Sequence, residues 1–327
     1  GVVWVGCLPK TAWPPTLIEV IEESNSIAVA GHTSPDGDAV ASCCALAMAL
    51  EKKGKKVSVF LEDIPEKFSS IPYSEKTLRN IENDDFDLFI SLDCGDEARL
   101  GEFSKLVKMV YTINIDHHAS NTYFGKLNFV DADASSTSEL IYRLLDGWCS
   151  MDKNIAYAIY TGIIFDTGCF KHSSTSPFTM KAAGELMTYN IPFTEIQEKL
   201  FYSHTFVEAK MLAEAVKNMR LECGGRLAVS KLSIEEMEKN GGTSKDADAV
   251  VSYIKNTDGV DAAVFFYEKK PGEIKASMRS NEAVNVSEIA VKFGGGGHVR
   301  ASGCTLYGTF EEVMPKVVDE LKKALEV

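Results

Sequence analysis

Residues 27–39 read IAVAGHTSPDGDA, and this stretch decides the fold of the first half of the chain. The small and β-branched residues at 27–31 predict a short buried strand. An apolar helical pattern over residues 38–53 predicts a helix after it. A strand that passes through a polar loop into a helix is the first part of a βαβ unit. The loop carries three side chains that can bind a cation: His32, Asp36 and Asp38.

The same alternation continues along the first half of the chain. Further runs predict strands at 57–61 (VSVFL), 86–93 (FDLFISLD) and 110–116 (VYTINID), and a helix near 99–108. Strands that alternate with helices favour an α/β fold with a mostly parallel sheet flanked by helices. Ligands of such sheets bind beyond the carboxyl ends of the strands, so we expect the functional residues there.

The rest of the chain predicts a helical segment and then a second, smaller α/β domain. Apolar spacing predicts helices at 135–145, 154–165, 176–189 and 194–202. Strands are expected at 226–231, 260–268, 273–280 and 301–306, with helices at 246–254, 286–293 and 310–325. For 327 residues, at roughly 150 per domain, we expect a first domain at 1–205, a linking helix at 206–220 and a second domain at 221–327.

The composition is that of a globular protein with an acidic surface. The chain is 45% apolar and 25% charged, which argues against disorder. Its net charge of −13 argues against binding long duplexes, because that needs clustered basic side chains. No apolar run approaches the about 20 residues of a membrane helix, and residues 1–10 lack the pattern of a secretory signal. The eight cysteines form no C-x-x-C pair. We expect a cytoplasmic protein without a membrane partner. Its oligomeric state stays open, a homodimer included.

Acidic and imidazole side chains recur where the predicted elements end. Beyond the loop after the first strand, they are Asp93 in SLDCGD, Asp116, His117 and His118 in NIDHH, and Asp166 in IFDTG. Taken singly, most are accounted for by a turn, a helix cap or a loop. Because the carboxyl ends of parallel strands meet at one edge of the sheet, together they predict one anionic pocket.

An anionic pocket of this kind needs cations. Carboxylates a few ångströms apart raise one another's pKa unless a cation neutralises them. Carboxylates suit hard divalent ions, and the imidazoles favour Mn²⁺ over Mg²⁺. Six candidate ligands are too many for one open catalytic ion, so we expect two ions about 3.5–4 Å apart that share a bridging carboxylate. The six ligands are His32, Asp36, Asp38, Asp93, His117 and Asp166.

These motifs resemble those of the DHH phosphoesterase superfamily. Four family motifs are matched in order by His32-x-x-x-Asp36-Gly-Asp38, Asp93, Asp116-His117-His118 and Asp166. The resemblance implies two ion sites that share Asp93. One would be held by His32, Asp36 and Asp93, and the other by Asp38, Asp93, His117 and Asp166. It also implies catalytic roles for His118, which would face the scissile phosphate, and for Asp116, which would orient the histidines.

A second motif, GGGGHVRASGC, occupies residues 294–304. Consecutive glycines leave backbone N–H groups accessible and suit a phosphate or nucleotide, although a flexible hairpin is the alternative. Positively charged hydrogen-bond donors would come from His298 and from Arg279 in ASMRS. The alternative for Arg279 is a solvent-exposed arginine at a strand edge. The predicted substrate-binding residues are Arg279, Gly295, Gly296, Gly297 and His298. The loop is similar to that of the DHH-associated C-terminal domain, so the resemblance spans nearly the whole chain.

The two domains together are similar to the NrnA-type nanoRNase and pAp phosphatase group, which is RecJ-like. This similarity implies a Mn²⁺-dependent phosphoesterase. Its substrates would be short single-stranded oligoribonucleotides, cleaved to mononucleotides, and 3′-phosphoadenosine 5′-phosphate (pAp), converted to AMP. Two alternatives stay open. One is a phosphodiesterase for cyclic dinucleotides or linear pApA, and the other is a catalytically silent nucleotide-binding sensor.

Overall fold

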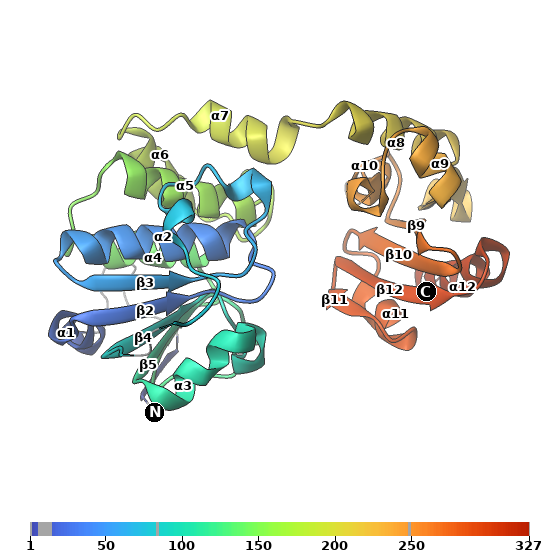
Figure 1. Ribbon diagram of the computed structural model, residues 1–327. Coiled ribbons are helices and arrows are strands. Elements are labelled where there is room, and N and C mark those ends of the chain that lie inside the picture. The colour runs from blue at the N-terminus through green and yellow to red at the C-terminus, as the bar shows by residue number, and fades with distance from the viewer. Residues whose placement is uncertain (1, 6–14, 83–84, 248–249, 327) are drawn as a thin grey trace. The chain divides into compact units, whose positions relative to one another are not determined.

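The computed structural model describes residues 2–5, 15–82, 85–247 and 250–326, apart from the side chains of residues 2–5, 15 and 298 (Figure 1). The chain divides into two units, Gly1–Ser203 and His204–Val327, each with its own sheet. The predictions about the amino-terminal segment fall largely on residues 1 and 6–14, which lie outside the described residues. In the described ranges no helix is both long and apolar enough to span a bilayer.

The first unit is built on a six-stranded sheet in the order β1-β6-β5-β4-β2-β3. The strands are β1 Val2–Val5, β2 Ser26–Ala30, β3 Lys56–Phe60, β4 Leu88–Leu92, β5 Thr112–Asp116 and β6 Leu127–Val130. Every neighbouring pair is parallel, which confirms the predicted sheet. Strands β1 and β6 were not predicted, because runs of four residues carry too short a pattern to separate from a loop.

Helices cover both faces of this sheet, because successive strand side chains point in opposite directions. The helices are α1 Pro15–Glu23, α2 Gly37–Lys52, α3 Lys105–Met109, α4 Thr137–Leu145, α5 Lys153–Asp166, α6 Pro177–Met187 and α7 Phe193–Gln197. Val29 of β2 belongs to the apolar cluster formed with α2, α4 and α5, whereas Ala30 belongs to the cluster formed with α3. In Figure 1, α2, α4 and α5 lie on one side of the sheet and α3 on the other.

Two predicted helices are interrupted. Over residues 99–108 the structure has a 3₁₀ segment, Glu97–Ser104, followed by α3. Gly101 has a φ of 56° inside this segment, a left-handed conformation that breaks a regular helix. Over residues 194–202, α7 ends at Gln197 and continues as a π-helix, Glu198–Tyr202.

The strand order determines where a ligand can bind in the first unit. Strand β2 lies between β3 on one side and β4 on the other, and the order then continues through β5 to β6. The connections therefore reverse direction across the sheet between β2 and β4. The carboxyl ends of the strands at such a reversal point are where ligands of doubly wound sheets bind.

The second unit has a mixed sheet of six strands in the order β11-β12-β10-β9-β8-β7. The strands are β7 Arg220–Glu222, β8 Leu227–Leu232, β9 Ala262–Lys270, β10 Glu273–Ser280, β11 Gly296–His298 and β12 Ala301–Tyr307. Only β8 and β9 pair in parallel. The helices are α8 Phe206–Lys217, α9 Ile234–Lys239, α10 Val250–Lys255, α11 Val286–Lys292 and α12 Phe310–Leu325. The predicted second α/β fold is confirmed, with α9, β7 and β11 as additional short elements. Helix α8 spans most of the expected linking segment and belongs to the second unit.

Candidate metal centre

The loop after β2 brings three of the predicted residues to the start of helix α2. Asp36 is the N-cap of α2, and its Oδ1 accepts hydrogen bonds from the backbone N–H groups of Asp38 at 3.0 Å and Ala39 at 3.1 Å. The capping interpretation is therefore right for Asp36, yet the same Oδ1 also lies 3.7 Å from Nε2 of His32. Helix capping and cation binding are compatible, because capping occupies Oδ1 and leaves the lone pairs of Oδ2 for a cation.

Gly37 lets the start of α2 lie against the end of helix α5. A Cβ at Gly37 would come within 2.5 Å of Cγ of Phe165. Phe165 precedes Asp166, the last residue of α5. The glycine in the Asp-Gly-Asp motif thus has a packing reason, since any side chain there would push apart the two helices that carry the candidate ligands.

Asp93 follows strand β4 and adopts an unusual backbone conformation. Its φ is 54°, in the left-handed region that a non-glycine residue enters at a cost of about 1 kcal/mol or more. Its backbone N–H donates to the carbonyl oxygen of Ile115 in the neighbouring strand at 3.1 Å. The side chain is 1% exposed. Strained backbone at a buried carboxylate is typical of a functional site.

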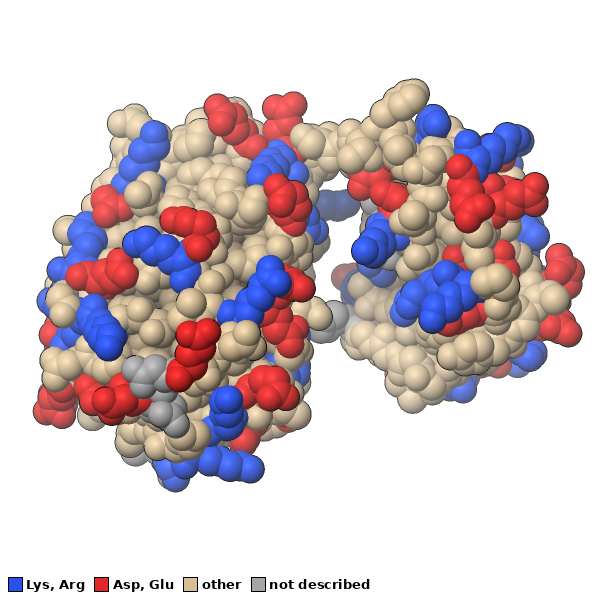
Figure 2. Space-filling model, in the orientation of Figure 1, with Lys and Arg blue, Asp and Glu red and all other residues tan. Residues whose placement is uncertain are grey.

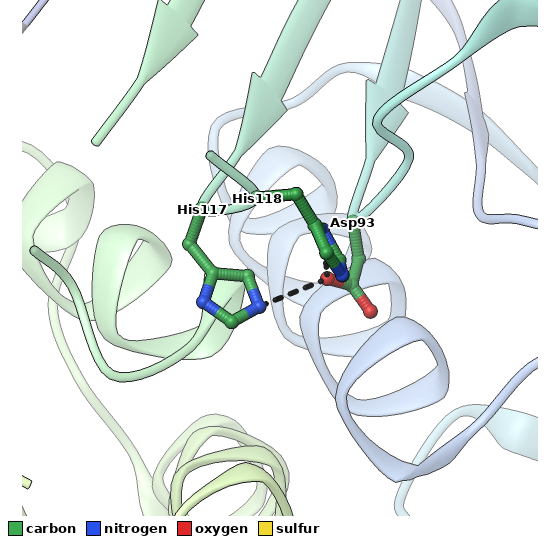
Figure 3. Close-up of side chains that lie close together, drawn as sticks. All are labelled: Asp93, His117 and His118. Atoms are coloured by element: carbon green, nitrogen blue, oxygen red, sulfur yellow. Dashed lines mark ion pairs between the residues drawn. The ribbon is translucent and has the colours of Figure 1, made fainter. Parts of the chain in front are cut away.

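The Asp93 carboxylate is shared by histidines that come from two different loops. Its Oδ2 lies 3.7 Å from Nε2 of His32, and its Oδ1 lies 3.6 Å from Nε2 of His117. Figure 3 shows the rings of His117 and His118, which follow β5, turned toward this carboxylate. Nε2 of His117 also lies 3.0 Å from Oδ2 of Asp166. The two oxygens of Asp93 therefore face two different sets of donors.

The structure gathers the predicted ligands into groups whose donor atoms lie within 4.8 Å of one another. One group contains His32, Asp36 and Asp93, and another contains Asp38, Asp93, His117 and Asp166. A third contains Asp93, His117 and His118. The first two groups have the same members as the two ion sites that the resemblance implied.

The geometry of these donors fits divalent cations. A separation of 3.6 or 3.7 Å is too long for a hydrogen bond. It is close to the roughly 3.0–3.4 Å between two donors that each lie about 2.1 Å from one ion. The other ring nitrogens face backbone carbonyls, Nδ1 of His32 at 2.7 Å from Thr33 O and Nδ1 of His117 at 3.4 Å from Ala134 O. That arrangement leaves each Nε2 as the ligand atom, as is usual for metal-binding histidines.

Three of these carboxyl groups have a raised pKa in the absence of cations. Burial, followed by the charge of Asp93, raises the pKa of Asp38 to about 7. Burial together with neighbouring carboxylates also raises the pKa of Asp93 and that of Asp166 to about 7. Burial alone would lower the pKa of His117, but its hydrogen bond to Asp166 and the nearby carboxylates raise that pKa well above its usual value. The pocket therefore attracts positive charge, whether from protons or from metal ions.

His118 is held by a chain of hydrogen bonds. Its Nδ1 lies 2.7 Å from Oδ1 of Asp116, a fully buried carboxylate at the end of β5. Asn121 donates to Oδ2 of Asp116 at 2.6 Å and to Oδ1 of Asn114 at 2.8 Å. The hydrogen bond to Asp116 is the main cause that raises the pKa of His118. Asp116 therefore orients His118 directly.

Two residues at this site were not predicted from the sequence. Asn121 fixes Asp116, and Thr137 at the start of α4 donates to Oδ1 of Asp93 at 3.0 Å. The sequence contains a clue to Asn121, since this residue lies in the turn directly after the Asp-His-His motif. The clue to Thr137 is weaker: the Ser136-x-x-Glu139 pattern marks the start of a helix after β6.

The predicted substrate-binding residues lie in the sheet of the second unit. The glycine run leads into β11, an edge strand that pairs with β12 in an antiparallel hairpin. A Cβ at Gly295 would collide with the carbonyl oxygen of Gly303, and one at Gly297 would come within 2.6 Å of the Ala301 carbonyl oxygen. A Cβ at Gly296 would meet nothing within 4 Å. The hairpin interpretation therefore explains Gly295 and Gly297, whereas Gly296 has no packing reason in the described residues.

Arg279 lies in β10 of the same sheet and is half-buried. Its Nη1 donates to the backbone oxygen of Met278 at 3.0 Å. Lys275 lies four residues earlier and on the same face of the strand. The backbone of His298, the last residue of β11, pairs with Ala301 in β12.

A parallel sheet whose carboxyl edge gathers carboxylates and imidazoles around one aspartate fits the class of metal-dependent hydrolases, which includes phosphoesterases. The chain belongs to the DHH family: the model described as "DHH family, N-terminal domain" matches residues 26–163, and the DHHA1 domain model matches residues 224–327. The predicted family and the prediction of an enzyme are confirmed by these matches.

The chain is also similar along most of its length to proteins with assigned activities. It is 30% identical over 309 residues to the bifunctional oligoribonuclease and PAP phosphatase NrnA of Thermus thermophilus, covering 91% of each chain. It is 32% identical to the protein of the same name from Bacillus subtilis, covering 89% of this chain and 92% of the relative. Among solved structures, an exopolyphosphatase-related protein from Bacteroides fragilis superposes with a TM-score of 0.86 at 28% identity, covering 95% of this chain and 94% of the other.

Proposed function

We propose that the chain is a phosphoesterase that uses two divalent cations, Mn²⁺ by preference, to hydrolyse short oligoribonucleotides to mononucleotides and pAp to AMP. The observation that carries this proposal is the division of the Asp93 carboxylate between two donor groups, each with its own histidine. Support for the substrates comes from the two relatives named as oligoribonucleases and PAP phosphatases, which are similar to this chain over about nine tenths of its length.

The donor set supports two ions rather than one. Asp36, Asp38, Asp93 and Asp166 together carry −4 when ionised, and two divalent cations would carry +4. When bound, the cations would supply an activated water and would neutralise charge on the phosphoryl oxygens. The protein residues would hold those ions in place and exclude other geometries.

His118 would act on the substrate. Because Nδ1 is engaged by Asp116, Nε2 is the nitrogen available to a phosphoryl oxygen or a leaving group. The hydrogen bond from Asn121 to Asp116 keeps the carboxylate from rotating, so the imidazole stays in one orientation. We assign His118 as the donor to the scissile phosphate. Asp116 would position the His118 ring.

The second unit would supply residues that bind phosphate and nucleotide groups. Arg279 and Lys275 on one face of β10 would contact phosphate groups, and the segment Gly295 to His298 would offer backbone N–H groups at the edge of the sheet. The open position at Gly296 supports this role, because close approach of a ligand is a reason for a glycine that packing does not require.

The surface charge supports short substrates. On the faces visible in Figure 2, Lys and Arg side chains are interspersed with Asp and Glu, and the chain as a whole carries −13. A nuclease that tracks along a polymer needs a continuous basic groove with stacking aromatics. Small substrates do not need such a groove.

A substrate panel tests this proposal directly. The full chain, with Mn²⁺ or Mg²⁺, would be given pAp, RNAs from dinucleotides to long oligomers, linear pApA and cyclic di-AMP. We expect the highest kcat/KM on pAp and the shortest RNAs. A strong preference for cyclic di-AMP would replace the proposed substrates, and the absence of turnover on every member would favour a sensor.

Two matched substitutions make the panel specific to the site. Asp93→Asn removes the shared anionic ligand while keeping its size, and we expect kcat to fall by at least about 100-fold. Asp133→Asn, at an exposed position in the loop after β6, should leave kcat unchanged. Turnover of Asp93→Asn at the level of the parent chain would contradict the shared-ligand role.

A further inference from the structure

Helix α4 begins directly against two of the candidate metal ligands. The backbone N–H of Thr137 donates to Oδ2 of Asp38 at 2.7 Å, and that of Ser138 donates to Oδ1 of Asp38 at 2.9 Å. All three residues are fully buried. Each oxygen of Asp38 thus accepts one hydrogen bond and keeps a second lone pair for a cation.

The hydroxyl of Thr137 connects this helix to a second carboxylate. Oγ1 of Thr137 donates to Oδ1 of Asp93 at 3.0 Å. Oδ1 is the oxygen that faces His117, whereas Oδ2 faces His32. A hydrogen bond to one oxygen restricts rotation about the Cβ–Cγ bond, so the Thr137 hydroxyl holds the plane of the Asp93 carboxylate between the two donor groups.

Helix α5 closes the other side of the Asp38 carboxylate. A Cβ at Gly162 would collide with Oγ of Ser138 and would come within 2.6 Å of Oδ1 of Asp38. Gly162 lies in the middle of α5, where a glycine costs about 1 kcal/mol relative to alanine, so its presence needs a reason. The start of α4 and the bare backbone at Gly162 together form a socket that holds Asp38 in one orientation.

We propose that Thr137 is a positioning residue for the metal centre. Its hydroxyl orients the Asp93 carboxylate between the two cation groups, and its N–H, with that of Ser138, orients Asp38. This inference rests on the proposed cation dependence and adds the residue that sets the geometry of the shared ligand. Without the hydroxyl, the Asp93 carboxylate rotates, and binding of a cation must then restrict that rotation at a cost in affinity.

Two substitutions at Thr137 separate the hydroxyl from the size of the side chain. Thr137→Val keeps the volume and the backbone N–H but removes the hydroxyl, and Thr137→Ser keeps the hydroxyl. We expect Thr137→Val to weaken Mn²⁺ binding by about 10- to 100-fold, measured by calorimetry and by electron paramagnetic resonance of free Mn²⁺. Thr137→Ser should bind Mn²⁺ within about threefold of the parent. At saturating Mn²⁺, KM for pAp should be the same in all three chains.

The outcomes distinguish this inference from the proposed function. The positioning role would be overturned if Thr137→Val bound Mn²⁺ with parental affinity. It would also be overturned if Thr137→Ser bound Mn²⁺ as weakly as Thr137→Val. If the parent hydrolyses none of the substrates but Thr137→Val still weakens Mn²⁺ binding, the positioning role stands and the substrate proposal fails. A parent chain that binds no Mn²⁺ would overturn both.

A matched pair of glycines tests the socket independently. Gly162→Ala should weaken Mn²⁺ binding by at least about 10-fold, because the added methyl group displaces Asp38. Gly184→Ala is the control, since Gly184 also lies inside a helix, α6, but a Cβ there would meet nothing within 4 Å. Gly184→Ala should keep parental Mn²⁺ affinity. Equal Mn²⁺ affinity of both variants would contradict the socket.

Discussion

Single residues at this centre serve two purposes each. Asp36 caps α2 through the same oxygen that faces His32, and Asp93 combines a left-handed backbone with a carboxylate divided between two histidines. These double roles have a physical reason, because burying a carboxylate costs free energy unless its lone pairs are satisfied by hydrogen bonds or cations. Each oxygen is therefore used as completely as the geometry permits.

At the residue scale we predict that Mn²⁺ binding releases protons. The pKa values of Asp38, Asp93 and Asp166 are about 7 in the metal-free chain, so these carboxyls are partly protonated at about pH 6.5. A cation binds the ionised forms, and its affinity should therefore rise as the pH rises from about 6 to about 8. Titration calorimetry in buffers of different ionisation enthalpy measures the number of protons released. Binding heats that do not depend on the buffer would contradict the prediction.

The raised pKa values of these three carboxyls also determine how the stability of the metal-free chain changes with pH. For these three carboxyls the pKa in the folded state lies above the value of 3.8 for the free side chain, so folding takes up protons between the two values. Their contribution to the free energy of unfolding therefore falls as the pH rises from 3.8 to about 7, and cation binding reverses this loss.

At the scale of elements, short segments carry the contacts that matter. The start of α4 holds Asp38 and Asp93, and β11 presents the glycine segment at the edge of its sheet. Helix α4 was predicted from its apolar spacing, but its contact with Asp38 was not, because the two lie 99 residues apart in the chain. A pattern within one segment contains no information about its distant partners.

Two neighbouring glycines should respond differently to alanine. Gly295→Ala forces a methyl group against the β12 backbone and should lower the free energy of unfolding by about 1–3 kcal/mol. Gly296→Ala meets open space and should change it by less than about 0.5 kcal/mol. Denaturant unfolding of the two variants measures both values. Equal losses would show that the run of glycines is needed for flexibility rather than for close packing.

At the scale of the whole molecule, the chain has separate apolar cores. Each of the four apolar clusters in the described residues lies within one unit: two in Gly1–Ser203 and two in His204–Val327. The candidate metal ligands all lie in the first unit. Binding of a cation should therefore stabilise one unit selectively.

Calorimetric unfolding of the full chain tests this separation. We expect two transitions. Mn²⁺ should raise the free energy of unfolding of only one of them, by about 2.7 kcal/mol for each bound ion at a free concentration of 100 times Kd. Asp93→Asn should abolish that increase and leave the other transition in place. A single transition that Mn²⁺ shifts as a whole would mean that the two units unfold together.

Much of the site could be predicted because parallel strands impose a common edge. Runs that end in Asp93 and Asp116 were recognised as strands, and their carboxyl ends had to meet once the sheet was parallel. The unpredicted β1 and β6 did not disturb this prediction, since they extend the sheet on the side away from β2. The role of Asn121 was not predicted because a lone amide in a turn is common.

By itself, the amino-acid sequence determined the family, the alternation of strands and helices, and the set of residues around the candidate metal centre. Only the tertiary structure decided how those residues are used: how the Asp93 carboxylate is oriented between His32 and His117, how Thr137 holds it, and why Gly162 must lack a side chain. The reason is physical. Periodicity and motif order are properties of neighbouring residues, whereas the orientation of a buried carboxylate depends on atoms that packing brings together from segments up to 100 residues apart in the chain.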